Sequence, residues 1–244
     1  MLAINWKTLA LFDDAPYQSS FSARVVALGE LGVALDQTLF YPTGGGQPGD
    51  VGAFFLEDGS AIPIVGTQRD PQQRGLIWHR LEGDPPPLSP GLGLKGSIAW
   101  GRRYQHMKMH TCLHLLCSLI DAPVTGCSIG DEKGRLDFDL PEMSLDKEAI
   151  TQALNELIRS GIEVKTRRMP AADYAAVLGL TRTQAAAPPV FEGAVRVIEI
   201  AGVDVQPCGG THVRNTAEIG RVVCDRIEKK SKHNRRVVLR FAEA

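Results

Sequence analysis

The sequence predicts an α+β protein in which a small N-terminal β-barrel, residues 1–95, precedes an α+β region, residues 96–244. Two observations lead to this prediction. Short strand-like runs separated by Gly and Pro fill the first third of the chain, as in small barrels. Helical and strand-like segments then alternate, which is typical of α+β folds. A chain of 244 residues is long enough to bury the cores of two small domains.

The barrel is predicted from closely spaced strand-like segments. Asp58-Gly59 is a typical hairpin-turn dipeptide between two of them. The stretch from Gly83 to Gly91 has the Pro-rich composition of a loop, so we place the boundary near residue 95. The expected strands are Phe21–Leu28, Val33–Tyr41, Val51–Leu56, Ala61–Thr67, Gly75–Leu81 and Leu94–Trp100.

The second region is predicted to contain two main helices. Arg102–Ile120 lacks Gly and Pro and repeats apolar residues at helical spacing. Asp146–Arg159 has an apolar face and ends before Ser160-Gly161. Ala171–Leu178 is expected to be a short helix. The expected strands are Arg135–Leu140, Ile162–Arg168, Val195–Ile200, Gly220–Ile227 and Arg236–Phe241.

Composition indicates an ordinary globular protein, with 43% hydrophobic and 23% charged residues. No apolar run is long enough for a transmembrane helix, and the N-terminus does not resemble a signal peptide. The five cysteines are an odd number without framework spacing, which favours free or metal-bound thiols. We therefore expect a cytoplasmic protein, and a monomer, although no motif fixes the oligomeric state.

The charge distribution is uneven. The net charge is −1, yet residues 221–240 hold eight Lys and Arg against two acidic residues. Such a basic segment on an otherwise acidic chain is typical of a polyanion-binding surface. A pair of strands with charged, solvated outward positions is the alternative.

Two histidines offer the first half of a metal site. His110 and His114 are spaced i,i+4 in the first predicted helix, so both imidazoles leave the same face. Two histidines on a polar helix face would show the same spacing. His106 lies one turn earlier, so spacing alone allows His106 with His110 as the pair.

Cys208-Gly209-Gly210-Thr211-His212 offers the second half. A Cys and a His on a Gly-Gly turn can converge on one ion, and a thiolate with three imidazoles suits zinc. A buried structural cysteine is the alternative. Four protein ligands would close a tetrahedral shell, whereas a catalytic zinc keeps an open position. We expect His212 to be the ligand that yields most readily.

Three longer motifs resemble a known family. They are Met109-His110-Thr111-Cys112-Leu113-His114-Leu115-Leu116, Gln206-Pro207-Cys208-Gly209-Gly210-Thr211-His212-Val213 and Phe40-Tyr41-Pro42-Thr43-Gly44-Gly45-Gly46-Gln47-Pro48-Gly49-Asp50. The first two resemble the metal motifs of the alanyl-tRNA synthetase editing domain and of its free-standing AlaX relatives. The third resembles the glycine-rich motif of the longer AlaX proteins. Asn234-Arg235-Arg236 also resembles the basic C-terminal strand of those proteins. The similarity spans residues 20–241.

The resemblance implies a zinc-dependent deacylase that removes serine or glycine wrongly esterified to alanine tRNA. The chain is too short for an aminoacylation domain, so it is expected to act in trans. One Zn²⁺ would be held by His110, His114, Cys208 and His212, leaving His106 as a bystander or as a residue that supports a ligand from outside. Zinc would polarise or position the aminoacyl ester, or lower the pKa of a bound water.

Further site residues are predicted around this centre. Recognition of the serine hydroxyl would discriminate against alanine, and Thr125 is the first candidate for it, with Ser128 second. Gln206 could orient water or a metal ligand. The glycine-rich residues would admit the tRNA acceptor end, and five basic residues would hold phosphates. These two sets are Gly44, Gly45, Gly46 and Gln47, and Lys229, Lys230, Lys232, Arg235 and Arg236.

Two other functions fit parts of the pattern. In a non-catalytic, zinc-stabilised tRNA-binding module the four ligands would be purely structural. A zinc peptidase is disfavoured because no Glu follows His110, where such enzymes carry their general base.

Overall fold

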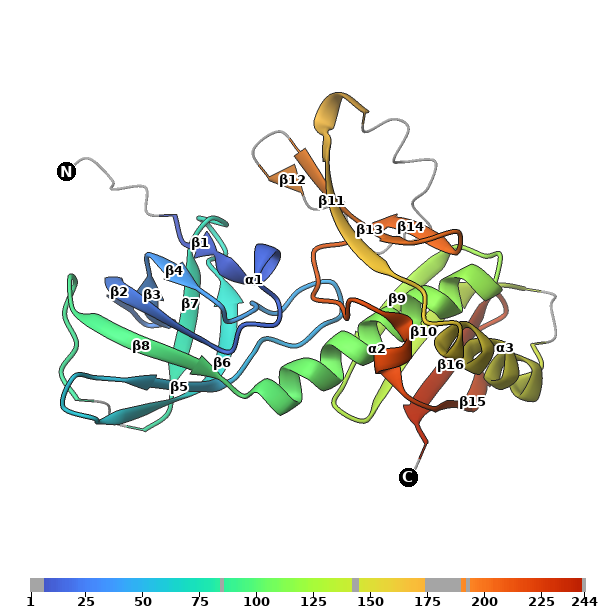
Figure 1. The fold of residues 1–244 in the computed structure, drawn as a ribbon, viewed down its shortest axis with the longest axis horizontal. Helices are drawn as coiled ribbons and strands as arrows, with labels where there is room; N and C mark the ends of the chain where they lie inside the picture. Colours follow the sequence, from blue (N-terminus) through green and yellow to red (C-terminus); the bar gives the residue numbers. More distant parts are fainter. Residues whose placement is uncertain (1–6, 84–85, 142–144, 174–189, 192–193, 243–244) are drawn as a thin grey trace. The chain divides into compact units, whose positions relative to one another are not determined.

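The computed structural model describes residues 7–83, 86–141, 145–173, 190–191 and 194–242, and Figure 1 shows their elements along the chain. The chain forms two compact units: residues 1–44 with 48–103, and residues 45–47 with 104–244. The predicted fold class, an N-terminal barrel followed by an α+β region, is confirmed. The limits 1–95 and 96–244 for two separate domains stay a prediction.

The first unit is a closed barrel of six antiparallel strands in the order β2-β3-β7-β6-β5-β8. Exposed and buried residues alternate along β2, so that Phe21, Ala23 and Val25 enter the core. The strands are β2 Ser20–Gly29, β3 Gly32–Leu35, β5 Gly52–Phe55, β6 Ala61–Arg69, β7 Ile77–Leu81 and β8 Gly93–Ile98.

The single strand expected over Val33–Tyr41 is wrong, because the chain turns at Asp36. The Asp36 carboxylate accepts hydrogen bonds from the backbone N–H of Arg24 at 2.8 Å and of Gln37 at 2.9 Å. Beyond it, β4, Gln37–Thr38, pairs in parallel with β1, Leu9–Ala10, which precedes the short helix α1, Leu11–Asp14. Side-chain capping of the backbone therefore interrupts the apolar run.

A buried ion pair fixes the end of the glycine-rich motif to the start of helix α2, Trp100–Leu119. The Arg103 guanidinium is fully buried and donates to both carboxylate oxygens of Asp50 and to the Leu39 carbonyl. Asp50 also accepts from the Tyr41 N–H at 2.6 Å. Because every charged atom of the pair is hydrogen-bonded, its burial is tolerated and its geometry is specific.

The second unit contains two sheets. One has the order β15-β16-β10-β9, and the other has β11-β13-β12 with β14 also paired to β13. The strands β9 and β14 were not expected from the sequence. The first sheet comprises β9 Val124–Ile129, β10 Lys133–Asp139, β15 Val222–Lys229 and β16 Asn234–Phe241; the second comprises β11 Val164–Pro170, β12 Val190–Phe191, β13 Ala194–Ile200 and β14 Asp204–Pro207.

Helices cover the first of these sheets. Gly134 of β10 lies so close to α2 that a Cβ there would meet the Met109 side chain at 2.7 Å. Helix α3, Lys147–Arg159, begins at Asp146, whose side chain accepts from the Ala149 N–H, and buries Ile150, Leu154 and Ile158. Both helices agree with the sequence expectations to within a few residues. No helix among the described residues is long and apolar enough to cross a membrane.

Two short 3-10 helices complete the described elements, η1 at Ala171–Asp173 and η2 at Thr216–Ile219. A capping box at Asn215 and Glu218 begins η2. The Asn215 side chain accepts a hydrogen bond from the Ala217 N–H, and the Glu218 carboxylate accepts one from the Asn215 N–H. Most of the short helix predicted over Ala171–Leu178 lies outside the described residues.

His79 is a neutral histidine inside the barrel core. Its ring is fully buried, with ring centroids 5.3 Å from Phe40 and 5.2 Å from Phe54. Nδ1 lies 3.0 Å from the Val33 carbonyl, and Nε2 lies 2.8 Å from the Thr38 hydroxyl. Burial lowers the pKa of His79 from 6.5 to about 4, despite the hydrogen bond to Val33.

We expect this histidine to make the barrel sensitive to acid. Between pH 6.5 and about 4, His79 is protonated in the unfolded chain but neutral in the folded one, so the free energy of unfolding falls as pH falls. The loss reaches about 3 kcal/mol at the low end. Urea unfolding of wild type and His79→Gln across this range should show a flatter pH dependence for the variant. His233→Gln, at an exposed position, is the control; equal slopes for all three proteins would contradict the expectation.

Candidate metal centre

Four of the predicted site residues converge on one point. The ligand atoms of His110, His114, Cys208 and His212 all lie within 4.8 Å of one another. The first two project from one face of α2, and the other two lie in the loop that follows β14. The three histidines are only 5–7% exposed. His106 is not in the cluster; it lies 2.6 Å from the Asp131 carboxylate instead.

The imidazoles present the same nitrogen to the cysteine. Nε2 of His110 lies 3.4 Å from the Cys208 sulfur, and Nε2 of His212 lies 3.3 Å from it. The Nδ1 of His114 faces away from the cluster, toward Asp204, which leaves its Nε2 to face inward. Three Nε2 atoms and one sulfur therefore form the donor set.

Each Nδ1 atom is held by a different partner. His110 Nδ1 lies 3.0 Å from the Gln47 amide oxygen, and His114 Nδ1 lies 2.7 Å from the Asp204 carboxylate. His212 Nδ1 lies 3.2 Å from the Thr111 hydroxyl, whose own proton goes to the Met107 carbonyl. All three partners accept a hydrogen bond from Nδ1–H, so Nε2 is the nitrogen of each ring that is left to bind a metal.

The Asp204 carboxylate that holds His114 is itself held by Gln206. Asp204 is 7% exposed, and the Gln206 amide donates to both of its carboxylate oxygens, at 3.0 and 3.1 Å. The two residues are two positions apart on β14 and so share one face of the strand. Gln206 thus acts on the site through Asp204.

The loop that carries Cys208 is anchored by a buried arginine. Arg196 on β13 donates to the carbonyl of Cys208 at 2.7 Å and to that of Gly210 at 2.8 Å. A Cβ at Gly210 would lie 2.1 Å from the His110 ring and 2.9 Å from the Gln47 amide oxygen. Only glycine fits there, because the loop backbone packs directly against a metal-facing imidazole.

Electrostatics favour a thiolate at the centre. Burial opposes ionisation of Cys208, but the neighbouring His110 and His212 hold the pKa of its thiol well below the ordinary value. Burial likewise opposes protonation of His114, yet the hydrogen bonds to Asp204 and Cys208 raise its pKa to about 10. The thiolate is the form of cysteine that binds metals. Three imidazoles and a thiolate fit a borderline-soft divalent ion such as zinc.

Part of the glycine-rich motif belongs to this centre. Gln47 is fully buried; besides His110, it contacts the Thr211 hydroxyl at 2.9 Å and the Thr211 N–H at 3.1 Å. Gly46 has a φ of +80°, and a Cβ there would lie 2.8 Å from the Cys127 sulfur. Gly45 is exposed, and no atom would lie within 4 Å of a Cβ there. Gly44 lies in the first unit and accepts from the Tyr41 hydroxyl.

The two predicted pocket residues lie on strand β9. Thr125 is exposed; its hydroxyl donates to the Asp137 carbonyl at 3.2 Å and accepts from the Asn234 amide at 2.9 Å. Ser128 is half-buried and pairs with Arg135 across the sheet. Their contact with a substrate stays a prediction.

The basic residues predicted to hold phosphates lie around the turn between β15 and β16. Lys230 pairs with Glu228 at 2.7 Å, and Arg236 pairs with Asp137 at 2.7 Å. The Arg235 guanidinium donates to backbone carbonyls, including that of Pro141 at 2.8 Å. Lys229 and Lys232 are exposed. Several of these cations are thus already used within the protein.

Asp204, Thr111 and Cys127 were not predicted from the sequence as site residues, whereas Gln206 was. Asp204 and Gln206 alternate before Cys208, a pattern that would have indicated a shared face had β14 been recognised. Thr111 carries no distinguishing signal within its helix. Cys127 lies close enough for the Cys208 charge to affect it, although burial is the main reason that its pKa rises to about 12.

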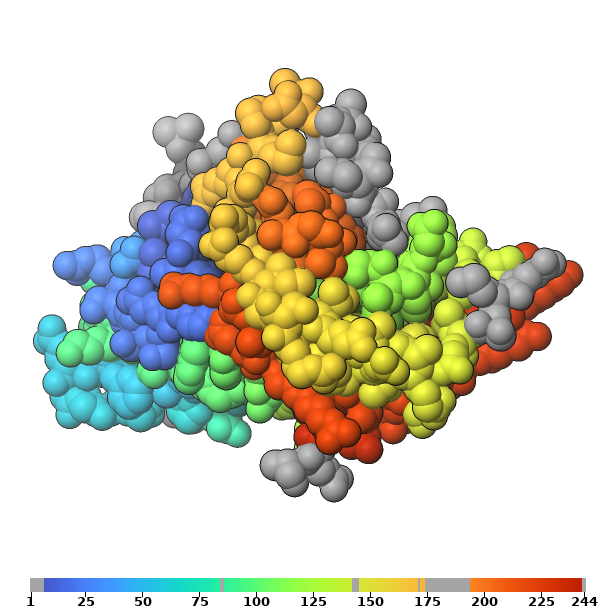
Figure 2. Space-filling model, turned by 45° about the vertical axis from the view of Figure 1, so that its right-hand side comes forward, coloured from blue at the N-terminus to red at the C-terminus, as the bar shows by residue number. Residues whose placement is uncertain are grey.

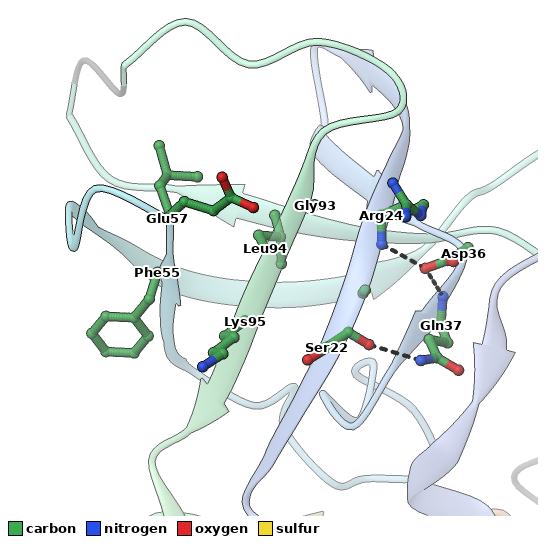
Figure 3. Close-up of a pocket in the computed structure, with 11 residues that line it drawn as sticks. Ser22, Arg24, Asp36, Gln37, Phe55, Glu57, Gly93, Leu94 and Lys95 are labelled. Atoms are coloured by element: carbon green, nitrogen blue, oxygen red, sulfur yellow. Dashed lines mark hydrogen bonds between the residues drawn. The ribbon is translucent and has the colours of Figure 1, made fainter.

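The barrel carries an open pocket of its own between β2, β5 and β8. Figure 3 shows hydrogen bonds on one side of it: Asp36 accepts from the backbone N–H groups of Arg24 and Gln37, and the Gln37 amide donates to the Ser22 carbonyl at 2.7 Å. None of the predicted site residues lines it. We assign it no role in the metal chemistry.

A barrel, an α+β unit and a histidine–cysteine centre define a tRNA-synthetase-related protein, as the comparisons show. Residues 195–238 match the model of the threonyl and alanyl tRNA synthetase second additional domain. The alanyl-tRNA editing protein AlaX-M of Saccharolobus solfataricus is 34% identical over 225 residues, which cover 91% of this chain and 93% of the relative. That of Methanosarcina barkeri is 35% identical over 94% of this chain and 97% of the relative.

The chain therefore belongs to the AlaX-M family of alanyl-tRNA editing proteins. It is also similar to the alanine–tRNA ligase of Pyrobaculum arsenaticum, with 35% identity over 91% of this chain but only 26% of the ligase. The family expected from the sequence motifs is confirmed.

Metal content should depend on the cluster and not on the neighbouring turn of α2. Cys208→Ala removes one of four donors, so the purified variant should hold well under half of the zinc bound by wild type. His106→Ala should keep the wild-type content, because His106 contacts Asp131 rather than the cluster. Elemental analysis with circular dichroism as a folding check tests both. Equal zinc loss in the two variants would refute the ligand assignment.

Gln47 should control metal affinity without touching the metal. Gln47→Met removes the acceptor for His110 Nδ1 and Thr211 N–H while filling a similar volume. Loss of such an outer partner typically weakens metal binding about 10–100-fold. Competition with a zinc chelator measures this change. Gln152→Met, on the exposed face of α3, is the matched control, and the idea fails if both variants bind zinc like wild type.

Proposed function

We propose that this chain is a trans-acting, zinc-dependent deacylase that hydrolyses alanine tRNA mischarged with serine or glycine. Its membership of the AlaX-M family makes it an aminoacyl-tRNA hydrolase. The observation that carries the finer proposal is the centre itself, in which four donors converge and each imidazole has its outer nitrogen held. A match along 93–97% of the AlaX-M relatives supports action in trans.

The chain's own residues would prepare the reaction. His110, His114, Cys208 and His212 would hold zinc, and Gln47, Thr111 and Asp204 would orient the imidazoles. Bound zinc supplies Lewis acidity, which polarises the ester carbonyl or acidifies a water molecule. The substrate is an activated ester, so no covalent nucleophile is needed, and Cys208 serves as a ligand. Gln206 positions Asp204 rather than contacting the substrate.

Serine is distinguished from alanine by one hydroxyl. A site that hydrogen-bonds this hydroxyl rejects alanine, because alanine leaves a polar group unpaired. Thr125 and Ser128 are the proposed partners on β9. The Thr125 hydroxyl already makes two hydrogen bonds, whereas in the described part of the chain no side-chain hydrogen bond occupies Ser128. Ser128 is therefore the freer of the two to bind a substrate hydroxyl.

Binding of the tRNA itself would use backbone and charge. Exposed Gly45 admits close approach by the acceptor end because no side chain stands there. Lys229 and Lys232 at the β15–β16 turn are exposed, and unlike Lys230 they form no ion pair among the residues that the structure describes. Such contacts contribute affinity rather than sequence selectivity.

A second candidate function is favoured by one observation. Four protein ligands complete a tetrahedral shell, as in structural zinc sites. In a non-catalytic tRNA-binding module, zinc would stabilise the fold and no ester would be cleaved. The deacylase proposal requires instead that a ligand, with His212 our first choice, yields or that a fifth position opens.

One assay separates these functions. The protein is incubated with alanine tRNA charged with serine, glycine or alanine, before and after zinc is removed by a chelator. We expect release of serine or glycine, with a preference over alanine on the order of a hundredfold or more. Chelation should abolish release, and added zinc should restore it.

Cys208→Ser and Ser128→Ala serve as the variants in this assay. Cys208→Ser should lose turnover on every substrate, and Ser128→Ala should lose turnover mainly on the serine ester. Circular dichroism is recorded on each sample. Absence of hydrolysis by the zinc-loaded wild type, with unfolding on chelation, would establish the structural module instead.

A further inference from the structure

A groove of about 710 Å³ runs between α3 and the strands β15 and β16. Figure 2 shows the face on which the helix, in yellow, lies beside the C-terminal strands, in red. Four cationic residues line the groove: Lys147 and Arg159 from the helix, Arg221 at the start of β15 and Arg240 from β16. None of the four is among the residues predicted from the sequence to hold phosphates, although Arg221 and Arg240 lie within the basic segment 221–240.

The groove holds more positive charge than its acids neutralise. Glu148 and Asp225 are its acidic residues. Arg240 lies 3.4 Å from the Asp225 carboxylate, which also binds Arg226 at 2.9 Å, so one acid serves two arginines. Among the residues that the structure describes, Lys147, Arg159 and Arg221 form no ion pair, and all three are exposed. The groove therefore has a local excess of positive charge, although the whole chain has a net charge of −1.

The cations are spread along the groove. The Val222 N–H donates to Asn155 at 3.1 Å, and the Cys224 N–H donates to Thr151 at 2.9 Å, so β15 runs antiparallel to α3. Arg221 therefore lies near the C-terminal end of the helix, where Arg159 is, and Lys147 marks the other end. A helix of 13 residues is roughly 20 Å long.

Two polar side chains on the floor of the groove, Asn155 and Thr151, are already hydrogen-bonded within the protein. The Asn155 amide donates to the carbonyls of Thr151 and Val222 and accepts from the Val222 N–H. The Thr151 hydroxyl donates to the Lys147 carbonyl and accepts from the Cys224 N–H. The charged side chains of the rim are therefore the main groups left to contact a ligand. Rim charges spread over several turns suit a repeated anion, as in a nucleic-acid backbone.

We propose that this groove binds the phosphate backbone of the tRNA, as a second contact surface that includes the end of the β15–β16 hairpin opposite to its turn. The inference rests on the proposed function for the identity of the RNA. It follows from charge: at the turn, Lys230 and Arg236 are paired with acids, whereas Lys147, Arg159 and Arg221 are not. Phosphate contacts replace condensed counterions, so binding through the groove depends on salt.

The double variant Arg159→Gln/Arg221→Gln tests this surface in the full-length, zinc-loaded protein. We measure the affinity for folded, uncharged alanine tRNA at several salt concentrations. Affinity should fall about tenfold or more at low salt, and the slope of log affinity against log salt should decrease by about two. Arg74→Gln/Arg80→Gln, which removes the same charge from exposed barrel positions, should change both quantities far less.

Three readings would overturn the proposal. The first is an unchanged affinity and salt slope in the groove variant, and the second is an equal change in the barrel variant. The third is competition by inorganic phosphate that exceeds the effect of chloride at equal ionic strength, because this would indicate a small-anion site. The zinc content and the thermal midpoint of each variant must match those of wild type. The charge-conserving variant Arg159→Lys/Arg221→Lys should bind tRNA more tightly than Arg159→Gln/Arg221→Gln, at close to the wild-type affinity. Because uncharged tRNA is the probe, this result does not depend on deacylation, and the kinetic assay above tests the hydrolase independently.

Discussion

The centre depends on one constraint: each of three imidazoles must keep its Nδ1 proton pointing outward. Gln47, Thr111 and Asp204 impose this constraint from three separate segments, at 3.0, 3.2 and 2.7 Å. With the outer nitrogen held, Nε2 of each ring faces the space beside the Cys208 sulfur. The result is a donor set arranged before any metal arrives, so little reorganisation accompanies binding. The same constraint explains the burial of Gln47 and Asp204, since a solvent-exposed acceptor would hold the ring less firmly.

Close backbone packing is the second requirement of this arrangement. Gly210 lets the Cys208 loop lie directly against the His110 ring, and Gly46 lets the chain pass against Cys127. Between these contacts, Gln47 links His110 to Thr211 of the loop. The glycine-rich motif thus supplies the centre with an orienting amide, and its glycines remove the side chains that would keep that amide away. A role of Gly45 in approach by the substrate is compatible with this, because its backbone is exposed.

Local pattern was sufficient to predict the elements that depend on it. Apolar periodicity predicted α2 and α3, and the i,i+4 spacing predicted that His110 and His114 share one face of a helix. The structure confirms both, and the comparisons confirm the family that the motifs indicated. Strands β9 and β14 were missed because Gly, Cys and Ser in one, and Asp and Pro in the other, weaken any strand signal. The partners of the imidazoles could not be predicted, since Gln47 and His110 are 63 residues apart and His114 and Asp204 are 90 apart. Only the folded chain brings them together.

The number of basic residues in a segment also fails to predict how much positive charge that segment presents in the folded protein. Residues 221–240 are strongly basic in sequence, but Arg236 meets Asp137, which is 99 residues away, and Lys230 meets Glu228. These pairs reduce the positive charge that the β15–β16 hairpin presents. Lys147 and Arg159 belong to an unremarkable amphipathic helix in sequence, and they gain significance only because Arg221 is brought beside that helix. A cation contributes to polyanion binding when no carboxylate of its own protein already compensates it. The distribution of acidic partners, and not the number of basic residues in a segment, therefore decides where this protein presents uncompensated positive charge.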